Sequence, residues 1–206
     1  MSIFEVQTIE QAPKGSRAPL ERLQQAFGMV PNVAGIIANS PVLANIFVPL
    51  FEGVHGGTFA EAEIQTLLLT NAVTNSCAWA VAFHSYLALK AGLNPADVEA
   101  IRQRRAPREP RTAALSAYAR ALIEKRGHVG DAAVTAFLTA GFKRDQALEA
   151  LAVSAASTIT NYTLNIAEPP LEPMFREHVW RPDTYFSGRP AFARSATSPS
   201  TIEGSL

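Results

Sequence analysis

Residues 60–93 read AEAEIQTLLLTNAVTNSCAWAVAFHSYLALKAGL, and this stretch decides the fold. Apolar residues recur in it at three- and four-residue spacing, whereas the alternation typical of a β-strand is hard to find. Asn75 interrupts the first run, a second run extends over residues 76–91, and Gly92 follows it as a residue that commonly ends a helix. The stretch therefore predicts two consecutive helices with a short connection.

The same periodicity continues on both sides of this pair. Pro41 is expected at the first position of a helix, and Pro49, further along, is expected to kink or shorten that helix. Asn94 and Pro95 start another short helix in a similar way. The remaining helices are expected over residues 20–27, 32–40, 111–125, 131–140 and 144–167. Because no β-type pattern competes with these segments, the predicted fold class is all-α.

Three polar residues precede the pair of helices. Thr58 and Glu61 are three residues apart, which is the spacing of a capping box at a helix N-terminus. His55 lies in the glycine-flanked loop GVHGG and could reach a pocket from there, but a surface position is the favoured interpretation. None of the three is therefore predicted to be catalytic.

The composition restricts the classes of protein to which the chain can belong. Its 206 residues suit one domain, and 18 basic residues balance 18 acidic ones, so charge gives no reason to expect nucleic acid or an anionic membrane as a partner. The N-terminus lacks the basic and apolar regions of a secretory signal, and no apolar run reaches the roughly 18 residues that span a bilayer. One cysteine cannot form an internal disulfide. We expect a soluble, cytoplasmic protein that binds no membrane, nucleic acid, metal or cofactor.

Cys77 and His84 are the candidate reactive residues of the stretch. At about 100° per residue, seven steps bring them to one helix face about 10.5 Å apart, so they cannot touch as helix neighbours. Cys77 falls in the first turn of a helix, where unpaired backbone N–H groups favour a thiolate and lower the thiol pKa. A buried, inert thiol is the alternative for Cys77, and a histidine satisfied within the core is the alternative for His84.

Together with VPNVAGIIANSP (30–41) and TNYTLNIAEPPLEPMF (160–175), this stretch resembles the carboxymuconolactone decarboxylase family, in its alkylhydroperoxidase D-like branch. The motif of that branch is Glu, eleven residues, Cys, two residues, Cys, three residues, His. The chain matches it at Cys77 and His84. It departs from the motif at Gln65, which replaces the glutamate, and at Ala80, which replaces the second cysteine. The resemblance covers residues 31–171 and implies an all-α, alkylhydroperoxidase D-like helical bundle.

The resemblance implies an antioxidant, peroxidase-like oxidoreductase in which two thiols cycle between dithiol and disulfide while a carboxylate and a histidine relay protons. Gln65 cannot transfer a proton as an acid or base, and Ala80 supplies no resolving sulfur. A peroxidase would thus depend on Cys77 alone, with a hydroperoxide substrate and an external thiol reductant. Two alternatives stay open: a lactone decarboxylase-like lyase or isomerase that uses His84 as general acid or base, and a catalytically inactive family member.

The resemblance also implies a homo-oligomer built on a dimer. Small residues along 147–160 are expected to contribute to a surface buried beyond the single chain. The domain is expected to span residues 1–185. Residues 186–206 are rich in Ser, Pro and Gly and are expected to form a low-complexity tail that is disordered in isolation.

Overall fold

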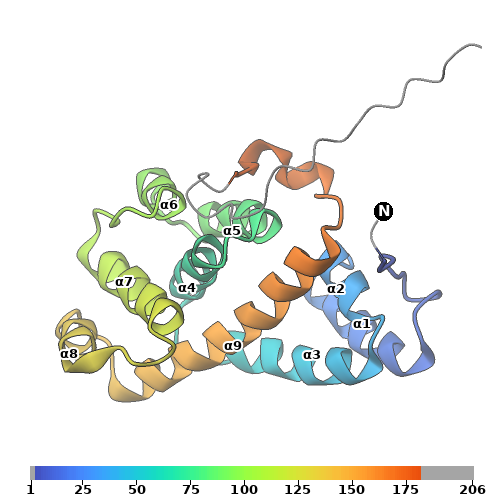
Figure 1. Ribbon diagram of the computed structural model, residues 1–206, viewed down its shortest axis with the longest axis horizontal. Helices are drawn as coiled ribbons and strands as arrows, with labels where there is room; N and C mark the ends of the chain where they lie inside the picture. Colours follow the sequence, from blue (N-terminus) through green and yellow to red (C-terminus); the bar gives the residue numbers. More distant parts are fainter. Residues whose placement is uncertain (1–2, 182–206) are drawn as a thin grey trace, which may run out of the picture.

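The computed structural model describes residues 3–181, which form an all-α bundle without any strand (Figure 1). This confirms the predicted fold class. The expected tail, residues 186–206, lies outside the described residues. The helices are α1 (Lys14–Phe27), α2 (Asn32–Ile37), α3 (Pro41–His55), α4 (Glu61–Thr74), α5 (Ala78–Lys90), α6 (Pro95–Arg102), α7 (Pro110–Glu124), α8 (Gly130–Thr139), α9 (Arg144–Ala167) and the 3₁₀ helix η1 (Pro173–His178).

Helix α4 is the centre of the bundle. All ten residues from Ile64 to Val73 are buried, because α5, α7 and α9 pack around it and α6 covers a further side. A helix that is covered on every side needs apolar or internally paired residues all round rather than a single apolar stripe. The long helix α9 crosses the molecule and contacts α2, α3 and α4 along its length (Figure 1).

Two local expectations are wrong, and both concern the approach to α4. Helix α3 continues past Pro49 to His55, so the alternative in which the proline shortens the helix is wrong. Thr58 does not cap α4, which begins at Glu61. Instead, the backbone N–H and the hydroxyl of Thr58 donate to the carboxylate of Glu149 on α9, at 2.5 and 2.6 Å. These bonds fasten the α3–α4 connection to α9 and fix the position of the residues on either side of it.

No helix among residues 3–181 is both long enough and apolar enough to cross a membrane. In the same range, no group of three or more His, Cys, Asp or Glu side chains is arranged to hold a metal ion.

Candidate functional site

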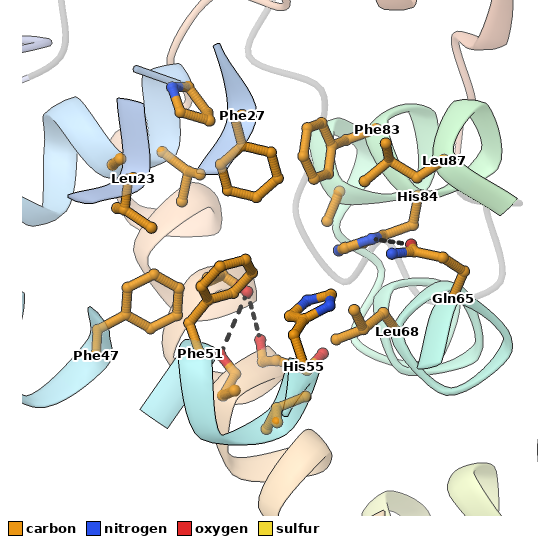
Figure 2. A pocket seen from close by; sticks show the side chains of 18 of the residues that line it. Leu23, Phe27, Phe47, Phe51, His55, Gln65, Leu68, Phe83, His84 and Leu87 are labelled. Carbon is orange, nitrogen blue, oxygen red and sulfur yellow. Dashed lines mark hydrogen bonds between the residues drawn. The ribbon is translucent and has the colours of Figure 1, made fainter. Parts of the chain in front are cut away.

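A cavity of about 350 Å³ lies between α1, α3, α4, α5 and α9 (Figure 2). Most of its wall is aromatic or aliphatic, with Leu23, Phe27, Phe47, Phe51, Leu68, Trp79, Phe83, Leu87 and Leu164 among the lining residues. A few polar side chains interrupt this wall: His55, Glu61, Gln65, His84, Ser157 and Thr160. An apolar cavity with a small number of converging polar groups is the usual form of a small-molecule site.

His84 is buried on α5, and Gln65 on α4 determines which of its ring nitrogens carries the hydrogen. The Nδ1 atom of His84 lies 3.0 Å from Oε1 of Gln65, whose Nε2 donates to Oε1 of Glu61 at 2.7 Å. An ionised carboxylate only accepts hydrogen bonds, so the amide turns its nitrogen to Glu61 and its oxygen to His84. Nδ1 of His84 therefore carries the hydrogen, and Nε2 is left with its lone pair.

His55 is the last residue of α3 and approaches the same carboxylate from another side. Its Nδ1 lies 3.1 Å from Oε2 of Glu61, and its ring packs on Phe51 one turn earlier, with the ring centroids 4.4 Å apart. The four side chains of His84, Gln65, Glu61 and His55 thus form one hydrogen-bonded series, which we call the polar chain. Figure 2 shows that both imidazole rings are turned toward the space near Phe51.

Burial and neighbouring groups give the members of the polar chain different protonation states. Burial, with a smaller contribution from His55, lowers the pKa of His84 to about 3, although Glu61 acts in the opposite direction. The hydrogen bond from His55 holds the pKa of Glu61 below its ordinary value, against the effect of burial. At neutral pH the cavity wall therefore holds an ionised carboxylate and a neutral His84.

Residues 41–121 match the model of the Carboxymuconolactone decarboxylase family. The matched segment spans α3 to α7 and holds the whole polar chain. No curated protein matches the sequence.

Solved structures confirm the alkylhydroperoxidase D-like fold. One is an uncharacterized peroxidase-related protein from Ralstonia eutropha JMP134 with an alkylhydroperoxidase AhpD core (TM-score 0.74, 20% identity, covering 84% of this chain and 94% of that one). Another is an uncharacterized peroxidase-related protein from Silicibacter sp. TM1040 (TM-score 0.69, 17% identity, covering 84% of this chain and 93% of that one). A third is a cysteine-to-alanine variant of the debrominase Bmp8 in complex with 2,3,4-tribromopyrrole (TM-score 0.68, 17% identity, covering 86% of this chain and 97% of that one).

The structure separates the residues that the family motif predicted to act together. His84, Gln65 and Ala80 line the cavity, whereas Cys77 is not part of its lining. Cys77 is the N-cap residue of α5 and is 1% exposed. Burial raises the pKa of its thiol to about 11, although hydrogen bonds from the backbone N–H groups of Ala80 and Trp79 act in the opposite direction. The expected lowering of this pKa is therefore wrong, because desolvation outweighs the favourable position at the helix end.

His55 and Glu61 are the members of the site that the sequence interpretation did not favour, because it preferred a surface position for His55 and assigned Glu61 to a helix cap. Glu61 precedes Gln65 by four residues on one helix, so both side chains lie on the same face. That spacing indicates a carboxylate one turn before the motif position, and it can be read from the sequence alone. The position of His55 cannot be read in this way, because it depends on the continuation of α3 past Pro49.

Proposed function

We propose that the chain is an enzyme that transfers protons on a small, apolar, lactone-like molecule, as an isomerase. The observation that supports this proposal is the polar chain in the wall of an apolar cavity. It presents Nε2 of the neutral His84, and it places Nδ1 of His55 against one carboxylate, Glu61, that can stabilise an imidazolium. Positioned imidazoles of this kind are the commonest general bases in enzymes.

His55 and His84 have different parts in this proposal. When Nε2 of His55 takes a proton from a substrate carbon, the resulting imidazolium is paired with the carboxylate of Glu61, which already accepts from its Nδ1. Protonation of His84 is opposed by its burial. His84 therefore serves as a neutral hydrogen-bond acceptor that orients the substrate, and Gln65 holds its ring.

The reaction needs no redox partner. The C–H bond next to a carbonyl group breaks, its electron pair remains on the substrate as an enolate, and the proton moves to Nε2 of His55. Return of that proton to a different carbon completes an isomerisation, and the electrons balance within the substrate. Ser157 lines the same cavity, and its Oγ accepts from Nδ2 of Asn161 at 3.1 Å. Its own hydrogen can then be donated to the enolate oxygen.

A one-cysteine peroxidase has less support. That activity needs an accessible thiolate beside the substrate, and Cys77 is buried, holds its proton more tightly than an ordinary thiol and does not line the cavity. Oxidoreductase activity, an antioxidant role and a cytoplasmic location remain predictions of the sequence.

The test uses α-angelica lactone, an uncharged unsaturated γ-lactone, in D₂O. We expect the protein to accelerate deuterium exchange next to the carbonyl, followed by NMR, and His55→Gln to lower the rate by about 100-fold or more. His128→Gln, which changes an exposed histidine outside the cavity, is the matched control and is expected to have no effect. The proposal fails if the protein leaves exchange unchanged, or if it instead consumes a hydroperoxide in a reaction that Cys77→Ala abolishes.

A further inference from the structure

The cavity that holds the polar chain is lined by no Lys or Arg side chain from the described part of the chain. Its wall carries the carboxylate of Glu61, which already faces Nδ1 of His55. Lys90 lines a neighbouring outer cavity of about 370 Å³ that shares Phe27 and Phe83 with the inner one, but it is exposed. A carboxylate that entered the inner cavity would lose its hydration without gaining a buried counter-ion.

The hydrogen-bonding groups of the wall also oppose an anion. His84 is neutral and holds its hydrogen on Nδ1, so its Nε2, the nitrogen left for a ligand, is an acceptor. This acceptor and the nearby carboxylate of Glu61 repel a ligand whose polar end only accepts. They favour a ligand that donates a hydrogen bond or a proton.

The α9 side of the cavity offers a hydrogen-bond donor instead of an acceptor. Ser157 is 1% exposed, and its oxygen accepts from Asn161. Among residues 3–181, no hydrogen bond uses Ser157 as a side-chain donor, so its hydroxyl is available to a ligand oxygen. Burial of this hydroxyl in a largely apolar wall favours a ligand that supplies the acceptor.

The cavity also disfavours a cation. Oε1 of Glu61 accepts from Gln65 and Oε2 accepts from His55, so each oxygen already has one partner within the polar chain. The remainder of the wall is mainly apolar. An ammonium or amidinium group would therefore share the carboxylate with Gln65 and His55 and would lose its hydration against an apolar wall.

We infer that the cavity selects an uncharged, apolar carbonyl compound and excludes molecules that carry a carboxylate. The carbonyl oxygen accepts from Ser157, and the hydrogen to be transferred lies toward His55. This inference rests on the proposed function in taking the cavity as the substrate site, and it adds the charge class of the substrate.

The experiment uses three unreactive probes of nearly equal shape: 2-naphthamide (neutral), 2-naphthoate (anionic) and 2-naphthamidine (cationic). Binding to the full chain at pH 7.5 is measured by calorimetry and by the fluorescence of Trp79, which lines the cavity. We expect 2-naphthamide to bind at least tenfold more tightly than either charged probe. Equal or tighter binding of a charged probe overturns the inference, and so does the absence of binding by all three at 1 mM.

Variants locate the binding and separate this inference from the proposed function. Ser157→Ala is expected to weaken 2-naphthamide about three- to tenfold without weakening naphthalene, which has no carbonyl group. Ser154→Ala, one turn earlier on α9 and outside the cavity lining, is the matched control. Lys90→Gln should leave the order of the three probes unchanged; reversal of that order overturns the inference. Because the probes do not react, the expected order together with absent lactone exchange would leave the inference standing and reject only the proposed function.

Discussion

At the scale of single residues, Gln65 has the largest influence on the chemistry of the cavity. An amide has one donating end and one accepting end, so it can connect a carboxylate to an N–H group, as it does between Glu61 and His84. A carboxylate at position 65, as in the family motif, would instead face the carboxylate of Glu61. The replacement therefore does more than remove an acid, because the amide connects Glu61 to His84 without placing two negative charges side by side.

The buried imidazole of His84 predicts a particular dependence of stability on pH. Its pKa is about 3 in the folded chain, against an ordinary value of 6.5. As pH falls below 6.5 the unfolded chain takes up the proton first, so the stability contributed by neutral His84 is complete above pH 6.5 and is lost progressively toward pH 3. Between pH 6.5 and 4, we expect the free energy of unfolding of the unmodified chain to fall more steeply than that of His84→Gln, by about 1 kcal/mol per pH unit. Urea denaturation at several pH values measures both slopes, and equal slopes would contradict the prediction.

Cys77 is expected to be inert in the folded protein. Its burial and raised pKa predict no labelling by iodoacetamide at pH 8 and complete labelling after unfolding in guanidinium chloride. Cys77→Ala is expected to cost about 1 kcal/mol of stability, because a small buried side chain is truncated, and to leave lactone exchange within twofold. Intact-mass spectrometry reports the labelling. Rapid labelling of the native chain would show that the thiol is reachable after all.

At the scale of elements, most helices were predictable, although α1 begins at Lys14 rather than at residue 20, and the connection before α4 was not predictable. Helix α9 was expected over residues 144–167 and occupies them, because its limits follow from local features such as the two prolines after Ala167. The fate of Thr58 was not predictable, because its partner Glu149 is 91 residues away in sequence. The raised pKa of Cys77 likewise depends on burial by distant segments. The site is least predictable where α3, α4 and α9 meet.

The bonds between Thr58 and Glu149 predict that α9 stabilises the position of His55 from a distance. Glu149→Ala removes two hydrogen bonds to a charged acceptor, and we expect it to cost about 1–2 kcal/mol and to slow lactone exchange several-fold. Amide hydrogen exchange should become faster over residues 55–61 and stay unchanged in α7. Glu124→Ala, which removes an ion pair with Arg104 instead, is the matched control. If residues 55–61 keep their protection in Glu149→Ala, the connection does not depend on these bonds.

At the scale of the whole molecule, α3 and α9 carry six exposed large apolar side chains. The two helices are in contact, and they expose Val42, Ile46, Leu148, Leu151, Tyr162 and Ile166. The small residues of α9 were expected to contribute to a surface between chains, but Ala150, Ser154 and Ser157 are buried within the chain itself. The large side chains on its outer face are now the reason to expect association.

We therefore expect the chain to form a dimer through this α3–α9 face. Light scattering after size exclusion should give about twice the chain mass of 22.1 kDa at micromolar concentration. Leu151→Glu places a charge in the middle of the face and should yield a monomer with unchanged helix content by circular dichroism. Lys125→Glu, on an exposed residue at the end of α7, serves as the charge-matched control. A monomeric unmodified chain would rule out the dimer.

The burial of Cys77 makes the protein a convenient carrier for site-specific probes. Because the chain has no other cysteine, a thiol introduced at an exposed position becomes the sole site that a maleimide dye or spin label can reach under native conditions. Lys90 lines the neighbouring cavity, so a label attached through Lys90→Cys would sit beside the cavity that holds the polar chain, with which the neighbouring one shares Phe27 and Phe83. Binding and release of uncoloured compounds can then be followed in real time, without removing any native residue of the inner cavity.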